Sequence, residues 1–189
     1  MTTPGASTPN QSRPASTIVL LGRPCDNTGI VREVLQHAAI DLTATILADP
    51  RTGTGPEPAE HEPHRLYRAP TPLATRRLLE HLHPDLVIAA CYPWRLSRRA
   101  LATARHGVLN IHPSPLPHGR GPDPTFWVYR NGEHEAGVTI HLMDDGLDSG
   151  PILAQQRLTV PEEKDAATLE LHLFEVGARM AASLIPQVL

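Results

Sequence analysis

Cysteine, lysine and aromatic side chains are scarce in this chain of 189 residues. Cys25 and Cys91 are the only cysteines, Lys164 is the only lysine, and aromatic residues make up 4% of the sequence. Two cysteines without a C-x-x-C motif provide no disulfide framework, so we expect a reducing, cytoplasmic compartment. No apolar run is long enough to span a bilayer, and residues 1–16 lack the apolar stretch of a secretory signal. We therefore expect no membrane partner and predict a disordered tail over residues 1–16, which are rich in Thr, Pro and Ser.

Several motifs for phosphate and metal binding are also missing. The turn after the first apolar run, residues 22–29, contains neither a P-loop nor G-x-G-x-x-G, which argues against a Rossmann-type nucleotide binder. A net charge of −3 argues against general nucleic-acid binding. The tightest histidine pairs, His61 with His64 and His81 with His83, do not form His-Glu-x-x-His, so we expect no metal site.

Short apolar runs alternate with amphipathic segments along most of the chain. This order predicts an α/β fold with a mostly parallel, Rossmann-like sheet and flanking helices. A β-hairpin and a helix should follow at the C-terminal end. The expected strands are 17–21, 42–48, 66–68, 85–90, 107–111, 136–143 and 150–160; the expected helices are 30–39, 71–82, 97–104 and 165–183. Residues 49–65, rich in Pro, Gly and Glu, are expected to form a long loop.

The ligand crevice of such a sheet lies beyond the carboxyl ends of its parallel strands. The segments 22–27, 91–96 and 112–123 should therefore line it. Asn110 and His112 lie two residues apart at a strand end, so their side chains leave on the same face. An amide donor beside an imidazole suits acyl transfer, because the amide can stabilise an oxyanion and the imidazole can move a proton. The same residues also fit an Asn that caps the strand beside an uninvolved His.

Two further features allow more than one interpretation. Asp144, Asp145 and Asp148 lie in a glycine-containing loop. Carboxylates there can orient a histidine and raise its pKa, or they can belong to an ordinary Asp-Gly turn. Cys91 follows an apolar run, where it suits either a nucleophile opposite His112 or a packed core thiol.

At residues 110–152 the sequence resembles the folate-dependent formyltransferase family. Residues 110–117 read Asn-Ile-His-Pro-Ser-Pro-Leu-Pro, residues 137–140 read Gly-Val-Thr-Ile, and residues 144–150 read Asp-Asp-Gly-Leu-Asp-Ser-Gly. The corresponding family patterns are Asn-x-His-Pro-Ser-Leu-Leu-Pro, Gly-Val-Thr-Ile and Asp-x-Gly-x-Asp-x-Gly, and the family's Arg-Gly pair corresponds to residues 120–121. Over residues 85–160 the residue types, their order and their spacing all agree with the family pattern. Over residues 17–84 only the order of strands and helices agrees.

The resemblance implies a formyltransferase fold, with residues 17–189 as the catalytic domain. It implies transfer of a formyl group from 10-formyltetrahydrofolate to an amino group. Asn110 would hold the formyl oxygen, and a protonated His112 would stabilise the oxyanion or relay a proton. Asp148 would tune His112 and help deprotonate the amine. Cofactor-binding positions implied in the same way are Tyr92, Trp94, Leu96, Asp144, Asp145 and Gly146. Substrate-binding positions are Ser114, Arg120 and Gly121.

Departures from the family pattern leave the amine acceptor open. Pro115 replaces a Leu, and the Gly-Ser-Gly-Asn stretch of glycinamide ribonucleotide enzymes is missing from the first loop. The extra C-terminal domain of methionyl-tRNA formyltransferases is not expected. Residues 123–127 and 138–142 are more similar to peptide-synthetase formylation domains and some amino-sugar enzymes, so the acceptor partner is a small molecule or is bound to a carrier protein. A 10-formyltetrahydrofolate hydrolase and an inert folate-binding module remain alternatives.

Overall fold

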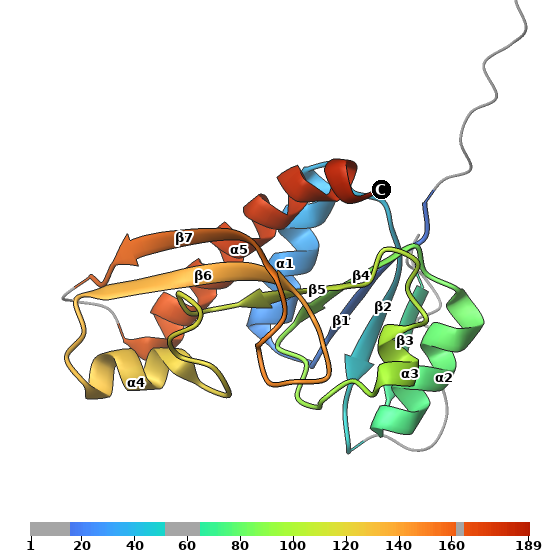
Figure 1. Cartoon of the computed structure of the whole chain (residues 1–189), viewed down its shortest axis with the longest axis horizontal. Helices are drawn as coiled ribbons and strands as arrows, with labels where there is room; N and C mark the ends of the chain where they lie inside the picture. The colour runs from blue at the N-terminus through green and yellow to red at the C-terminus, as the bar shows by residue number, and fades with distance from the viewer. Residues whose placement is uncertain (1–15, 52–64, 162–164) are drawn as a thin grey trace, which may run out of the picture.

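The computed structural model describes residues 16–51, 65–161 and 165–189. A seven-stranded sheet runs through the molecule in the order β3-β2-β1-β4-β5-β6-β7 (Figure 1). The strands from β3 to β5 in this order pair in parallel, whereas β6 pairs antiparallel with both β5 and β7. The strands are β1 (Ile18–Gly22), β2 (Leu42–Ala48), β3 (Arg65–Ala69), β4 (Leu86–Ala90), β5 (Val108–His112), β6 (Glu135–Leu142) and β7 (Ile152–Thr159). This arrangement confirms the predicted α/β class and the C-terminal hairpin.

Within the described ranges, five helices accompany the sheet. They are α1 (Asp26–His37), α2 (Pro72–Leu82), α3 (Arg98–Leu101), α4 (Pro124–Arg130) and α5 (Ala166–Val188). Helices α1 and α5 pack on one face, where the larger core cluster includes Leu35 and Phe174. Helices α2 and α3 pack on the other face, over β1, β2 and β4, through residues such as Leu79 and Ala100. None of the helices in the described part of the chain is long and apolar enough to cross a membrane.

Local sequence signals explain where most of the elements begin. Every residue of β1 and β4 is buried, as expected for parallel strands covered on both faces. Thr71 caps α2 by accepting a hydrogen bond from the Ala74 N–H, and Pro72 occupies the first turn. These signals in the sequence are local, which is why they predict the elements correctly.

Three helices differ from the expected bounds. Helix α1 begins at Asp26 rather than residue 30, α3 ends at Leu101, and α5 continues through Pro186 to Val188. The short helix α4 was not expected, although Pro124 at its first position is a recognised start signal. The predicted tail over residues 1–16 and loop over 49–65 lie mostly outside the described residues.

The two faces of the sheet are not covered equally near β5 and β6. Leu109 and Ile111 point into the larger core, so Asn110 and His112 point to the opposite face. Helices α2 and α3 pack over the neighbouring strands on that side. Figure 1 shows β6 and β7 extending well past the parallel strands, with a loop between them that returns toward the end of β5. Loops, rather than a helix, therefore cover the polar side chains at the end of β5.

Candidate active site

A pocket of about 300 Å³ lies at the carboxyl ends of β1, β4 and β5, where the topology predicts a ligand crevice. The β6–β7 loop closes one side of the pocket, and α5 contributes Glu170 and Phe174. Of the residues predicted to form the site, the pocket is lined by Tyr92, Trp94, Leu96, Asn110, His112, Gly121, Asp144, Gly146 and Asp148. Ser114, Arg120 and Asp145 are not among the lining residues.

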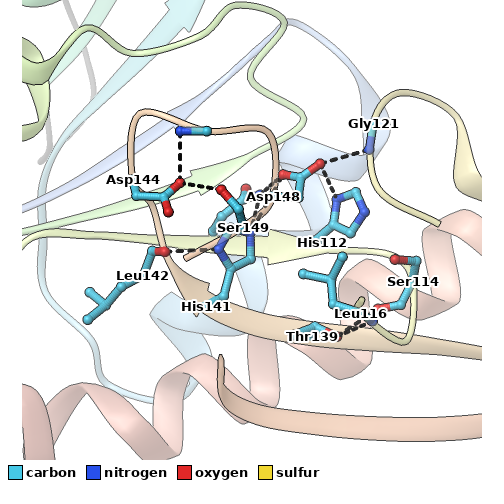
Figure 2. A network of polar contacts seen from close by, with 12 residues as sticks. His112, Ser114, Leu116, Gly121, Thr139, His141, Leu142, Asp144, Asp148 and Ser149 are labelled. Atoms are coloured by element: carbon cyan, nitrogen blue, oxygen red, sulfur yellow. Dashed lines mark hydrogen bonds and ion pairs between the residues drawn. The ribbon is translucent and has the colours of Figure 1, made fainter. Parts of the chain in front are cut away.

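Asn110, His112 and Asp148 converge in this pocket from two segments, the end of β5 and the β6–β7 loop. Figure 2 shows the Asp148 carboxylate facing the His112 ring. The amide nitrogen of Asn110 lies 3.4 Å from Asp148 Oδ1, and His112 Nδ1 lies 3.8 Å from Asp148 Oδ2. The N–H of Gly121 donates to Asp148 Oδ2 at 2.9 Å. Asp148 adopts a left-handed backbone conformation with φ +46°, which turns its carboxylate back toward the strand end. The fold therefore brings an amide, an imidazole and a carboxylate together around one small volume.

The loop that carries Asp148 is held by its own polar contacts and by a close backbone approach. Asp144 Oδ1 accepts hydrogen bonds from the Gly146 N–H at 2.9 Å and the Ser149 hydroxyl at 2.8 Å. A Cβ on Gly150 would lie 1.8 Å from the Leu142 carbonyl oxygen, so only glycine fits there. These contacts place Asp144 in the pocket wall, where it stabilises the turn.

Hydrogen bonding defines the tautomer of His112. Its Nε2 lies 2.8 Å from the Gly119 carbonyl oxygen, which can only accept, so Nε2 carries the proton. In the neutral ring, Nδ1 then presents a lone pair on the side of Asp148. Burial lowers the pKa of His112, and the negative charge of Asp148 only partly offsets this effect. The expected increase in the pKa of His112 from the carboxylate is present, but the effect of burial is larger, so the imidazole is neutral at neutral pH in the free protein.

For Asp148, the polar contacts outweigh the effect of burial on the pKa. Burial by itself would raise its pKa, but the contacts with His141 and His112 and the hydrogen bond from the Gly121 N–H favour the carboxylate. The net result is a pKa below the ordinary value. Asp148 is therefore charged at neutral pH.

His141 is a functional candidate that the sequence analysis missed. It lies on β6 directly opposite Asn110 and is 1% exposed. Its Nε2 lies 3.1 Å from the Asn110 amide nitrogen and 3.6 Å from Asp148 Oδ1. The alternation of β6 offered a signal, because Thr139 and His141 are polar residues on one face of a strand whose other face is apolar.

The predicted cofactor wall is partly assembled. Tyr92 and Trp94 form an edge-to-face pair with ring centroids 5.7 Å apart, and Leu96 is buried beside the pocket. Burial raises the pKa of Tyr92 to about 12, so its phenol is neutral. Asp145, in contrast, binds Arg98 at 2.6 Å, and its carbonyl accepts a hydrogen bond from Arg95. The structure thus directs the Asp145 side chain to the surface rather than into the pocket.

Two predicted substrate-binding residues occupy other positions. Ser114 is 2% exposed, and its hydroxyl donates to the His118 carbonyl at 2.8 Å, so it stabilises the loop after β5. Arg120 is exposed and does not line the pocket. Gly121 does line it, and its backbone holds Asp148.

The other end of the pocket is lined by Arg23, Cys91, Asp123 and Glu170. Cys91 hydrogen-bonds the sulfur of Cys25, and chiefly through this contact the pKa of Cys25 falls to about 5. The pKa of Cys91 rises because it holds the proton of that bond and is buried. Burial raises the pKa of Glu170, although Arg23 opposes the shift. This end thus combines one cation with several anionic or ionisable groups.

The structure also shows where the candidate metal ligands lie. Within residues 16–51, 65–161 and 165–189, no group of three or more His, Cys, Asp and Glu side chains is arranged to hold a metal ion. His81 and His83 are exposed, whereas His61 and His64 lie outside the described residues.

Comparison with known proteins adds an independent finding. A family model described as formyl transferase matches residues 26–185. Methionyl-tRNA formyltransferases from Thermodesulfovibrio yellowstonii and Chloroflexus aurantiacus are 38% identical over 110 residues and 41% identical over 120 residues. These matches cover 58% and 64% of this chain but 36% and 38% of the relatives. The matched part thus spans little more than a third of these relatives.

Solved structures agree over nearly the whole chain. A phosphoribosylglycinamide formyltransferase from Brucella melitensis superposes with a TM-score of 0.71 at 26% identity, covering 92% of this chain and 95% of that one. A likely sugar N-formyltransferase from Mycobacterium tuberculosis shares the fold with a TM-score of 0.64 at 20% identity, covering 92% and 67%. The match of the family model over most of the sequence shows that the chain belongs to the formyl transferase family, as its motifs at residues 110–152 indicate.

Proposed function

We propose that this chain transfers a formyl group from 10-formyltetrahydrofolate to the amino group of an acceptor. The observation that carries the proposal is the convergence of Asn110, His112 and Asp148 in one pocket beside an aromatic wall. In this proposal, residues 17–189 act as one catalytic domain. Its two thiols suit a reducing, cytoplasmic compartment.

The lining of the pocket suits the folate co-substrate. Trp94, Leu96 and Met143 offer an apolar surface, and residues 144–148 lie in a loop with polar backbone groups. A flat, hydrogen-bonding ring fits between two such surfaces. When bound, 10-formyltetrahydrofolate supplies an activated formyl group.

The chain's own residues would act on the acyl carbon in a defined order. Asn110 donates to the oxygen on which negative charge develops. His112 accepts the proton of the attacking amine at Nδ1, which carries the lone pair in the tautomer that Gly119 stabilises. The charged Asp148, 3.8 Å away, stabilises the imidazolium that results. His112 then returns this proton to the departing nitrogen.

The acceptor is assigned to the end of the pocket lined by Arg23, Asp123 and Glu170. This end can pair with both cationic and anionic parts of an acceptor. The acceptor is a carrier-bound aminoacyl group, an amino sugar or, by analogy with the curated relatives, a methionyl-tRNA. Each would place its amine between this end of the pocket and His112.

The test is tetrahydrofolate release from 10-formyltetrahydrofolate, followed spectroscopically with a panel of amines. The panel contains amino-sugar nucleotides, carrier-bound aminoacyl thioesters, free amino acids, glycinamide ribonucleotide and methionyl-tRNA. We expect release that depends on one amine and falls on the order of a hundredfold or more in Asn110→Ala. Asn131→Ala is the matched control, because Asn131 is exposed after α4 and bonds only to Glu133 among the side-chain contacts described.

Other outcomes of the assay have clear meanings. Rapid release without any amine would identify a hydrolase instead. Folate binding without release across the panel would favour an inert binding module. An Asn110→Ala variant that works at the wild-type rate would contradict the assigned chemistry.

A further inference from the structure

Both ring nitrogens of His141 have defined partners. The side chain is buried on β6, on the same sheet face as Asn110, its cross-strand neighbour. Nδ1 lies 3.0 Å from the Leu142 carbonyl oxygen, and Nε2 lies 3.1 Å from the amide nitrogen of Asn110. Figure 2 shows the contact with Leu142. Together the two contacts determine which ring nitrogen of His141 carries the proton.

The Leu142 carbonyl determines the tautomer. A carbonyl oxygen only accepts hydrogen bonds, so the ring proton of a neutral His141 resides on Nδ1. Nε2 then carries a lone pair that accepts a hydrogen bond from the Asn110 amide. His141 is therefore a hydrogen-bond acceptor at the position where it meets Asn110.

Asp148 favours the same orientation of the amide. The nitrogen of Asn110 lies 3.4 Å from Asp148 Oδ1, so both of its neighbours are acceptors. Rotating the amide by half a turn would place its carbonyl oxygen against a lone pair and a carboxylate, which is repulsive. One amide hydrogen thus binds His141 at 3.1 Å. The other makes only the longer contact of 3.4 Å with Asp148 in the free protein, and it can exchange this contact for an acyl oxygen placed in the pocket.

We propose that His141 is a positioning residue that binds one amide hydrogen of Asn110 and so directs the other toward the acyl oxygen of the bound substrate. The proposal rests on the proposed formyl transfer. His141 touches no reacting atom and acts through Asn110. In its absence the amide can rotate and present a carbonyl oxygen where a donor is needed, which abolishes the stabilisation of the oxyanion.

The first arm of the test measures the tautomer without any assay of activity. Nitrogen-15 NMR of histidine-labelled protein near neutral pH distinguishes the protonated ring nitrogen from the bare one. The His141 signals are identified by their loss in His141→Gln. We expect a proton on Nδ1 and none on Nε2. A proton on Nε2, with or without one on Nδ1, would overturn the proposal.

The second arm compares two substitutions. His141→Leu removes the acceptor, so we expect kcat to fall on the order of a hundredfold with KM for both substrates nearly unchanged. His141→Gln places an amide oxygen near the position of Nε2, so kcat should recover to within about tenfold of the wild type. His81→Leu, at an exposed position on α2, is the matched control.

The outcomes separate the possible failures. A folded His141→Leu protein with wild-type kcat would overturn the proposal, as would a folded Gln variant as impaired as the Leu variant. Thermal unfolding of each variant shows whether it is folded. If the wild-type protein transfers no formyl group, the proposed function fails, while the tautomer measurement still decides how Asn110 is oriented.

Discussion

Replacing Asp148 by Asn isolates the charge of this carboxylate. Asn is nearly isosteric, retains an oxygen that can accept from the Gly121 N–H, and adopts the left-handed conformation that Asp148 occupies at φ +46°. The loop should therefore keep its shape. What is lost is the negative charge 3.8 Å from His112 Nδ1.

The size of the effect follows from this distance. Two unit charges about 4 Å apart at an effective dielectric constant of about 20 interact by about 4 kcal/mol. His112 and Asp148 are 7% and 12% exposed at the side chain, but the pocket admits water, so we take about half this value. A loss of about 2 kcal/mol corresponds to about 1.5 pKa units and about thirtyfold in rate.

The direction of the pKa shift is also defined. Burial already lowers the pKa of His112, and Asp148 partly restores it. Removing the carboxylate should therefore lower the pKa of His112 further. If neutral His112 acts as the base, the acid limb of the kcat/KM profile should move to lower pH by the same amount.

The assays are an NMR titration of His112 and the pH profile of amine-dependent tetrahydrofolate release. Asp145→Asn is the matched control in the same loop, because Asp145 binds Arg98 and does not line the pocket. An unchanged His112 titration in folded Asp148→Asn would refute the electrostatic argument. A normal shift with an unchanged rate would refute the role of the imidazolium.

Two further predictions concern the thiol pair and the buried hydroxyl on β6. Because the pKa of Cys25 is lowered to about 5, the fraction of Cys25 present as thiolate at pH 6 should exceed that of an ordinary thiol on the order of a hundredfold. The rate of its alkylation by iodoacetamide should follow this fraction and decline as the pH falls through about 5. Mass spectrometry of labelling against pH checks this, and the midpoint should rise in Cys91→Ala; an ordinary midpoint in the wild type would contradict it. Thr139→Val leaves the Leu116 N–H without its partner at 3.1 Å and should cost about 1–3 kcal/mol in urea unfolding. The exposed Thr159→Val is its control, and equal effects of the two would contradict the reasoning.

The order of the strands and helices could be predicted because it depends on local patterns. Runs such as 85–90 are apolar at every position, and a buried parallel strand is the element that suits them. The two-residue spacing of Asn110 and His112 likewise determines that they share a face, whatever the rest of the chain does. The motifs at residues 110–152 indicated the family in the same way, since spacing and residue type are properties of the sequence itself.

Contacts between distant segments could not be obtained from such patterns. Asn110 meets Asp148 across 38 positions and His141 across 31, and these pairings require the register of β5 on β6. The same applies to Asp145, whose motif suggests the pocket but whose side chain finds Arg98 instead. Ser114 also belongs to the motif at residues 110–117 that resembles the family pattern, yet its position in the loop after β5 buries it.

What the sequence by itself determined is the layer architecture, the family motifs and the two polar side chains that leave β5 together. Only the tertiary structure decided their protonation and their partners. The sequence suggested that a nearby carboxylate would raise the pKa of His112, but the result depends on how much water the fold removes, and here burial outweighs the charge. His141 became visible only when β6 was placed against β5, because a hydrogen bond depends on positions in space rather than on distance along the chain.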